Sequence, residues 1–509
     1  MKRLVFGVLL VLVLSACGGG NSGSSGSSAT VKTGGTLRVA QESEIVTLDP
    51  NNSGLVVERE IYSNMYDSLV AIDPGLKFVP SLATDWKYSD PTTLTFTLRK
   101  GVKFQDGTDF SADAVKFNID RYLTDPKSLR KSELASVDSV EVKDPQTAVF
   151  HLKKPDATLL AQLVDRAGMM LSPTAVKAGG AGFTVSPINA GTGPFQFVEW
   201  KRDDHLTLKR NPNYWKRDSS GKQLPYLDQL TYRPMINLDA MLAGLKTNDL
   251  DFARGIAAKD VEAIKADSSL VYKDVPALGF QGFEVNSGAE PFNDAAKRKA
   301  VALALDRAQY LKNVQFNVGV VSHGPIPPSS WAADPSEKIY DQADAAKAKS
   351  TATGFSFTLK TGNTQDAIQG GQLIQAQLAK AGITVTLSPE DFGKLTTETR
   401  AHQFQAALSG WSGRIDPDGN MFAWFHTGGS FNDGQYSNAQ VDTDLEQARA
   451  TTDQAKRKQL YDDAQKALVQ DGAYMFTYHP TAQWISSTKV HNFTLFPDTI
   501  NRFGEVWLG

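Results

Sequence analysis

The feature that most constrains this chain is a pair of alternating apolar and polar segments on either side of a helix-like segment. Residues 355–359 alternate as one strand and residues 383–387 alternate as another. Between them, residues 364–381 have helical periodicity, which stops at Gly382. A βαβ-like unit of this kind predicts an open α/β sheet.

A third alternating segment, residues 404–408, predicts a strand that joins the same sheet. Its apolar pattern stops at a loop, residues 408–420, which carries a Trp, an Arg and two Asp between Gly and Pro residues. Ligands of open α/β sheets bind in the crevice outside the carboxyl ends of the strands. We therefore expect this loop to form the floor of a binding cleft.

The chain has 509 residues, which is too long for one hydrophobic core, so we expect two or three domains. Its 41% hydrophobic and 21% charged residues are typical of a soluble globular protein. The formal net charge is −3, and it becomes −5 without Lys2 and Arg3, because 51 basic residues then stand against 56 acidic ones. This mild acidity argues against a nucleic-acid partner, which selects basic surfaces.

The first thirty residues are typical of an exported lipoprotein. Residues 1–16 combine a basic start, a short apolar run and small residues, which predicts a signal peptide rather than a membrane span. The segment 14–17 resembles the bacterial lipobox, whose Cys is lipidated; the alternative is an ordinary leader with a chance Cys. Cys17 is the single cysteine of the chain, so no disulfide forms within it. Residues 17–30 are predicted to comprise the lipidated Cys17 and a flexible Gly/Ser tether. We therefore expect the protein to be exported and lipid-anchored to the cell membrane, facing the periplasm or the cell exterior.

Several motifs resemble, in order and spacing, those of the peptide/nickel/opine solute-binding proteins, family 5 of the extracellular receptors of ABC importers. The signature region of that family is similar to segments 82–86, 96–104, 106–107 and 111–115 of this chain. Further similar segments are 191–195, 210–215, 283–286 and the helix 297–307.

This resemblance implies an α/β, two-lobe periplasmic-binding-protein fold (type II, cluster C-like). It has an extra subdomain in the first lobe and a hinge of two crossing strands. The implied limits are 31–60, 185–280 and 480–509 for the core of the first lobe, 61–184 for the inserted subdomain and 281–479 for the second lobe. The crossing strands are expected near residues 278–286 and 474–478.

Helical periodicity in the second lobe predicts one helix from Asp294 to about Val314, capped by Asn293. Two further helices, about residues 441–450 and 453–469, carry dense charge, which we interpret as a solvated face.

Binding residues are expected in the loop after the strand at 404–408. Trp411 offers a flat wall or a hydrogen-bond donor, and Arg414 offers a rigid fork suited to carboxylate or phosphate. Asp416 either accepts from an ammonium group or orients Arg414, and Asp418 is a turn residue. The structural alternatives are an inter-domain core position for Trp411 and an Arg414–Asp416 ion pair.

In the oligopeptide and dipeptide receptors that the chain resembles, the residue three after the corresponding Trp is typically an Asp that holds the α-amino group of the peptide. This chain has Arg414 there. We therefore expect a ligand that presents a carboxylate, a phosphate or a polar neutral group, with peptides as the second choice. Further candidates for the wall of the site are Ser412, Thr47, Leu48, Phe280, Gln281, Asn432 and Tyr436.

An enzyme is disfavoured, because Asp416 and Asp418 lie two residues apart in a loop, a spacing that fixes no acid/base geometry. No Gly-x-Ser-x-Gly elbow or phosphate-loop motif occurs. An EF-hand register would place Arg414 and Phe425 at ligand positions, and the seven histidines form no ligand pair, so no metal and no cofactor is expected.

The leading hypothesis is a monomeric solute receptor, with permease and ATPase subunits of an ABC importer as partners. The alternatives are an exported hydrolase and a receptor for sensing without transport.

Overall fold

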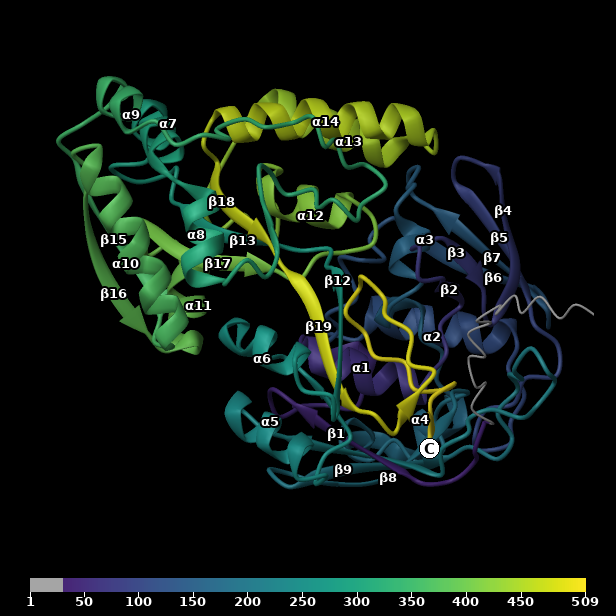
Figure 1. Ribbon diagram of the computed structural model, residues 1–509. Helices are drawn as coiled ribbons and strands as arrows, with labels where there is room; N and C mark the ends of the chain where they lie inside the picture. Colours follow the sequence, from purple (N-terminus) through teal and green to yellow (C-terminus); the bar gives the residue numbers. More distant parts are fainter. Residues whose placement is uncertain (1–30) are drawn as a thin grey trace, which may run out of the picture.

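The computed structural model describes residues 31–509, which form two lobes joined by two crossing strands (Figure 1). The signal peptide, Cys17 and the tether lie outside the described residues. Lobe I is built on a seven-stranded and a four-stranded sheet, and lobe II on a six-stranded sheet. None of the helices in the described part of the chain is long and apolar enough to span a bilayer.

The central sheet of lobe I has the order β12-β19-β11-β1-β10-β9-β8. Its strands are β1 (Thr36–Gln41), β8 (Phe195–Lys201), β9 (His205–Arg210), β10 (Gln229–Pro234), β11 (Phe252–Arg254), β12 (Leu270–Pro276) and β19 (Thr481–Ser487). Strand β1 is parallel to both β10 and β11. The helices of this part are α1 (Val56–Met65), α5 (Leu238–Lys246) and α6 (Val261–Lys265), and a short hairpin pairs β20 (Val490–His491) with β21 (Trp507–Leu508).

The second sheet of lobe I has the order β4-β5-β7-β6 and is antiparallel throughout. One hydrophobic core runs through both parts of lobe I. The elements of this second part are β2 (Val70–Ile72), β3 (Phe78–Pro80), β4 (Ala83–Asp90), β5 (Thr93–Leu98), α2 (Ala112–Thr124), β6 (Val137–Asp144), β7 (Thr147–Leu152), α3 (Leu159–Gln162) and α4 (Pro173–Gly179).

Lobe II has a sheet of order β14-β18-β13-β17-β15-β16. Its strands are β13 (Phe280–Val285), β14 (Val320–Val321), β15 (Ser356–Gly362), β16 (Thr384–Glu390), β17 (Ala406–Trp411) and β18 (Tyr474–His479). Its helices are α7 (Ala295–Ala304), α8 (Arg307–Val314), α9 (Ala345–Thr351), α10 (Gln365–Lys380), α11 (Phe392–Arg400), α12 (Asp418–Phe425), α13 (Ala439–Ala450) and α14 (Gln454–Gln470).

The predicted βαβ unit is confirmed, because α10 connects the parallel strands β15 and β16. Strand β17 joins that sheet parallel to β15, as the alternation at 404–408 predicts. The single helix predicted over 294–314 is wrong. The chain is extended at Leu305, and Asp306 caps a second helix by accepting from the Gln309 amide at 2.8 Å. The cap of α7 is Asp294, not Asn293.

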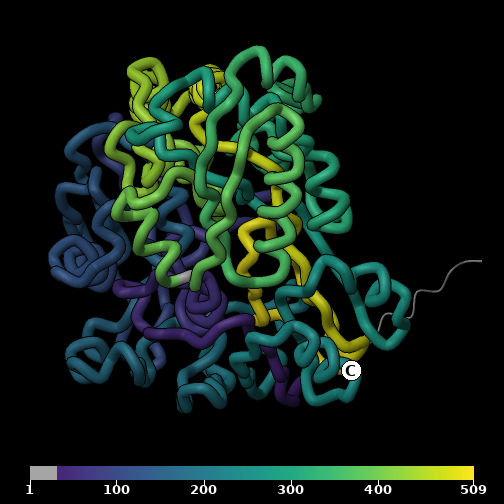
Figure 2. Tube along the Cα trace, turned by 90° about the vertical axis from the view of Figure 1, so that its left-hand side faces the viewer, coloured from purple at the N-terminus to yellow at the C-terminus, as the bar shows by residue number. Residues whose placement is uncertain are grey.

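The lobes are connected where β12 continues into β13 and where β18 continues into β19. The two connections are neighbours: β12 pairs with β19 in lobe I, β13 pairs with β18 in lobe II, and the Ala277 amide donates to Pro480 O at 3.0 Å. Figure 2 shows lobe II above lobe I with this crossing between them. At Gly279 a Cβ atom would lie 2.0 Å from Trp411 O, so only glycine permits the crossing to pass the end of β17. The domain limits drawn from the sequence stay a prediction.

Strand β13 carries a buried carboxyl group, Glu284, beside Ala407 and Tyr474 of the neighbouring strands. Its Oε2 atom has no hydrogen-bond partner within the described residues. Burial, and next the negative charge of Asp433, raise the pKa of Glu284 from 4.5 to about 8.

This raised pKa predicts a pH-dependent stability. Between pH 4.5 and 8 the folded chain keeps a proton on Glu284 that the unfolded chain loses, so the free energy of unfolding falls as the pH rises. Glu60, whose pKa burial also raises to about 8, contributes in the same direction. We expect Glu284→Gln to flatten this slope and to stabilise the protein at pH 8 by more than about 1 kcal/mol.

Urea unfolding at several pH values from 5 to 8.5 measures the effect. A slope that is the same in the parent and in Glu284→Gln would contradict it.

Candidate functional site

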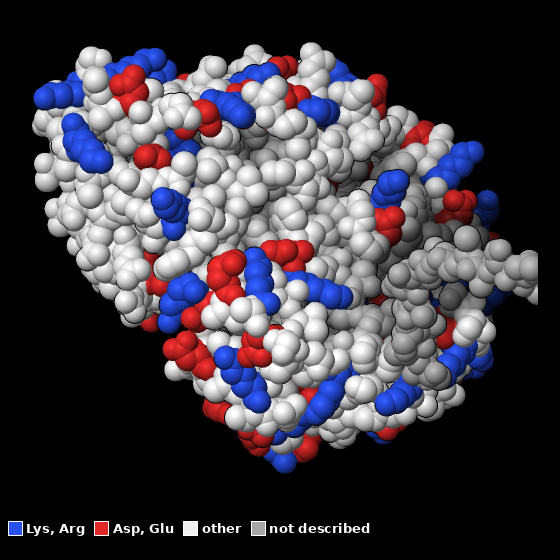
Figure 3. Space-filling model, in the orientation of Figure 1, with Lys and Arg blue, Asp and Glu red and all other residues white. Residues whose placement is uncertain are grey.

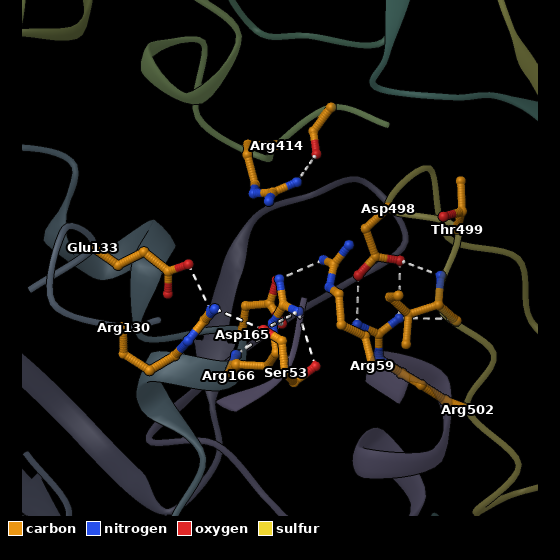
Figure 4. A network of polar contacts seen from close by, with 12 residues as sticks. Ser53, Arg59, Arg130, Glu133, Asp165, Arg166, Arg414, Asp498, Thr499 and Arg502 are labelled. Atoms are coloured by element: carbon orange, nitrogen blue, oxygen red, sulfur yellow. Dashed lines mark hydrogen bonds and ion pairs between the residues drawn. The ribbon is translucent and has the colours of Figure 1, made fainter. Parts of the chain in front are cut away.

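The loop after β17 faces lobe I across the space between the lobes. Figure 4 shows Arg414 of this loop pointing toward side chains of lobe I, chiefly Arg130, Asp165 and Arg166. In Figure 3 the surface between the lobes is hollowed and mostly uncharged, while charged side chains gather on the outer faces. The cleft therefore holds its charges inside, away from the surface seen in this view.

Trp411 ends strand β17 and is half-buried. Its ring packs on Trp424 and Phe431, with centroids 5.7 and 5.0 Å away. The indole Nε1 donates to Asn420 Oδ1 at 3.1 Å, and the Arg414 guanidinium lies over the ring at 4.3 Å. Trp411 thus joins the aromatic core of lobe II and supports Arg414 by a cation–π contact.

Arg414 has no carboxylate within 4.0 Å among residues 31–509. Its Nη1 donates to Gly413 O at 2.8 Å, and its backbone amide donates to Asn420 Oδ1 at 3.0 Å. Burial, and then the positive charges of Arg59 and Arg166, lower its pKa to about 9. Arg414 is therefore a half-buried cation that faces other cations across the cleft.

Asp416 does not pair with Arg414, so the alternative of an Arg414–Asp416 ion pair is wrong. Both of its oxygens accept from Arg457, at 2.7 and 2.9 Å, and Oδ1 also accepts from the Tyr461 hydroxyl at 3.4 Å. The Arg457–Asp416 pair is buried on both sides. The oxygens that would hold an ammonium group are therefore already occupied.

The sequence predicts that Asp418 is a turn residue. This prediction is wrong, because Asp418 is the first residue of α12. It is buried and accepts two hydrogen bonds from Arg449, both of 2.7 Å. Arg449 lies on α13 and Arg457 on α14. The sequence predicts that the charged side chains of these two helices form a solvated face. These two arginines instead point inward and fix the loop that carries Arg414.

Four of the expected wall residues lie in the protein interior: Phe280, Leu48, Thr47 and Tyr436. Phe280 and Leu48 are completely buried, the first among Trp424 and other aromatic rings and the second in the core of lobe I. Thr47 is buried as well, and its hydroxyl donates to Thr184 O at 3.3 Å. These positions are core, because the segments that carry them turn into the lobes rather than toward the cleft.

The remaining candidates are distributed differently. The Asn432 amide group bonds Tyr436 N and O at 2.9 and 2.7 Å, and the Tyr436 hydroxyl donates to Asp471 at 2.9 Å, so this pair holds its own loop together. Gln281 is half-buried and lies against Gly410, and Ser412 is exposed at the start of the loop. Trp411, Ser412 and Arg414 are thus brought together on one loop, while Asn432 and Tyr436 belong to a different loop, next to Phe431, which packs on Trp411.

The charged residues of lobe I that face Arg414 carry no signal in the sequence, because they are far apart in the chain. Arg59 lies on α1, and its Nη2 is 2.7 Å from Asp165. Arg130 is 2.6 Å from Glu133, and Arg166 donates to Ser53 O and Oγ, both at 3.1 Å. Burial raises the pKa of Asp165, but Arg59, Arg166 and Arg414 together hold it below its ordinary value. Only the folded chain assembles this group.

A cavity of about 410 Å³ in lobe I adjoins a small pocket lined by Arg414, and both are lined by Arg59, Asp165, Ile415 and Asp498. Ile415, from the loop of lobe II, packs against the hydrophobic core of lobe I and forms part of the cavity wall. The volume of this cavity is in the range of roughly 300–1,000 Å³ that is usual for small-molecule sites. Within residues 31–509, no three His, Cys, Asp or Glu side chains are placed to hold one metal ion.

Two lobes that meet over a cleft are the architecture of proteins that bind a solute between them. A family model described as "Bacterial extracellular solute-binding proteins, family 5 Middle" matches residues 77–433. The chain belongs to this family, as its motifs predict, and its members are solute-binding proteins rather than enzymes.

Relatives and solved structures are similar over almost the whole chain. The glutathione-binding protein GsiB of Pectobacterium atrosepticum is 29% identical over 488 residues, which cover 92% of this chain and 93% of that protein. Among solved structures, the periplasmic binding protein DppA of Helicobacter pylori, in complex with the peptide STSA, has a TM-score of 0.83 and 26% identity, covering 94% and 98% of the two chains. The oligopeptide-binding protein AppA of Bacillus subtilis, in complex with a nonapeptide, has a TM-score of 0.82 and 26% identity, covering 94% and 100%. The two-lobe fold is thereby confirmed.

The Arg457–Asp416 pair predicts a large loss of stability in Asp416→Ala. This substitution leaves the buried guanidinium of Arg457 without its partner, so we expect a loss of roughly 3–5 kcal/mol. Urea unfolding measures it, with the exposed Asp463→Ala of α14 as the matched control, expected within about 0.5 kcal/mol of the parent. Equal stability of the two variants would show that this pair does not hold the loop.

Proposed function

We propose that this chain is the substrate-binding lipoprotein of an ABC importer. It captures a small polar solute with an anionic group between its lobes and delivers it to a permease. The observation that supports this function best is Arg414, a half-buried cation without a carboxylate partner among the described residues, on the loop that faces the cleft. Membership of the solute-binding family supports the transport role.

Export and anchoring are proposed from the N-terminal sequence. The signal peptide 1–16, Cys17 and the Gly/Ser tether place the folded lobes close to a membrane without fixing their orientation. This arrangement suits a receptor that must release its cargo to a permease in the same membrane. The partners in this scheme are the permease and ATPase subunits, and the receptor acts as a monomer held by lipid alone.

A peptide-like or opine-like acid is the solute class that we propose. Relatives are named glutathione-binding proteins, and glutathione is a peptide with two carboxylates. A solved relative binds the tetrapeptide STSA. Since both oxygens of Asp416 bind Arg457, recognition in this loop falls to Arg414, which attracts an acid and repels an ammonium group.

Closure follows from contacts with both lobes. A ligand that touches Arg414 from lobe II and the facing side chains of lobe I binds the closed form better than the open one, and so shifts the population toward it. The crossing strands carry the motion because they form the connection between the two sheets.

Arg414→Ala tests this function. Native mass spectrometry of protein purified from its source identifies the retained solute, and calorimetry then compares its affinity for parent and variant. Loss of a charge-assisted contact in a desolvated cleft is expected to weaken binding by roughly 2–5 kcal/mol. Arg202→Ala, an exposed arginine of lobe I, is the matched control and should bind like the parent. Unchanged affinity in Arg414→Ala would remove the anchor role, and chemical conversion of the solute would identify a hydrolase instead.

A further inference from the structure

A direct hydrogen bond joins the two lobes at a place apart from both the crossing strands and Arg414. The amide of Ala157, in the loop between β7 and α3 of lobe I, donates to Arg449 O of lobe II at 2.9 Å. Figure 1 shows α13 and α14 of lobe II extending toward this part of lobe I. Because its two residues lie on different lobes, this bond must break when the lobes move apart.

The bond satisfies the end of a helix. Arg449 lies one residue before the end of α13, so its carbonyl oxygen has no partner within the helix. The preceding carbonyl, Ala448 O, accepts from Arg457 Nε of lobe II at 3.0 Å. The next one, Arg449 O, accepts from lobe I instead. The negative end of the helix dipole lies at this terminus and favours an N–H donor.

The loop that carries the donor is held in place by Asp156. Its Oδ1 atom accepts from the amide and the hydroxyl of Thr158, at 2.8 and 2.7 Å, and its Oδ2 atom accepts from the Ser136 hydroxyl at 2.6 Å. Ala157 lies between the two residues that these bonds fix. Its amide is therefore positioned before lobe II arrives.

Asp156 also attracts lobe II by its charge. Burial lowers the pKa of Arg449, but the hydrogen bonds and charge of Asp418, and after them the negative charge of Asp156, hold that pKa above its ordinary value. Asp156 thus acts on Arg449 across the boundary between the lobes. It has two effects on the same contact, one on the position of the donor and one on the charge opposite.

Arg449 connects this contact to the loop after β17. Its guanidinium binds both oxygens of Asp418 at 2.7 Å, and Asp418 begins α12, four residues after Arg414. The same guanidinium lies 3.3 Å over the Phe422 ring of α12. Arg449 therefore contacts lobe I through its carbonyl oxygen and the loop of Arg414 through its side chain.

We propose that Ala157 and Arg449 form a latch, a contact between the lobes that stabilises the closed receptor and so raises its affinity for its solute, with Asp156 as a positioning residue. The latch does not touch the solute, so it adds the same stabilisation whichever molecule is bound. This inference rests on the closure that belongs to the proposed function, and it adds a determinant of closure outside the binding site. A net hydrogen bond of ordinary strength changes an equilibrium by roughly threefold to tenfold.

The test follows the distance between the lobes by pulsed electron paramagnetic resonance. Nitroxide labels are placed on Lys143→Cys of lobe I and Gln459→Cys of lobe II, both exposed, in a Cys17→Ser background that removes the single native cysteine. The probe is the solute released by heat from the protein purified from its source, which is titrated into the emptied protein. We expect the solute to shorten the distance in the parent.

Three variants locate the effect. Ala157→Pro removes the N–H donor and Asp156→Ala frees the loop, so each should raise the solute concentration at half-closure at least threefold. Asp156→Asn keeps an acceptor for Thr158 and loses only the charge, so it should lie between Asp156→Ala and the parent. Asp138→Ala, at an exposed aspartate of the same part of lobe I, should respond like the parent.

The rates separate a latch from a general loss of structure. The latch exists only in the closed form, so the variants should release the solute faster, by the same factor, and take it up at the parental rate in stopped-flow fluorescence. Thermal unfolding verifies that each variant is folded, and Asp156→Asn carries the test if the other two are not.

Parent-like half-closure and release in the folded variants, or an effect on uptake alone, would overturn the inference. A parent that closes on the solute while its variants do the same loses only the latch. A parent whose lobes stay at one distance loses both the latch and the proposed function.

Discussion

Positive charge enclosed between the lobes is the constraint on which the rest of the structure depends. A buried cation is costly unless it is paired, and here Arg414 of lobe II faces Arg59 and Arg166 of lobe I. Arg59 and Arg130 form ion pairs with Asp165 and Glu133, Ser53 O accepts from Arg130 and Arg166, and the Trp411 ring supports Arg414. The contact with the Trp411 ring positions the guanidinium of Arg414 without neutralising it, which leaves its charge available to the ligand that we propose.

The surrounding ion pairs have the opposite role, because they are complete. Arg457 binds both oxygens of Asp416, and Arg449 binds both oxygens of Asp418. These pairs tie the loop after β17 to α13 and α14, so Arg414 projects from a rigid base. The two neutral ion pairs hold the fold of the loop, whereas the unpaired cation Arg414 is the part that we propose binds the solute.

The amino-acid sequence predicts the architecture better than the site. Alternation at 355–359, 383–387 and 404–408 marks buried strands, since one face of each must be apolar, and the family motifs imply the two lobes. The break at Leu305 escapes notice because an apolar residue there continues the helical stripe, while Asp306 resembles any surface Asp. Within the site, the position of Trp411 and Arg414 follows from the end of a strand. The residues that contact or face this loop cannot be predicted from the sequence. Arg457 lies in a helix whose composition is that of a solvated surface. Arg59, Arg130 and Arg166 come from distant segments of the chain and are brought together only by packing.

The two crossing strands lie side by side and are paired with each other in both sheets, with the Ala277 amide bonded to Pro480 O at the passage. A ribbon of two tethered chains bends readily in one direction but resists twist and lateral slip. In the transport role that we propose, the lobes therefore approach each other along one path, and every bound solute meets the same final alignment of the two lobes. A permease that recognises the closed receptor then needs to recognise only one shape, whichever molecule lies inside.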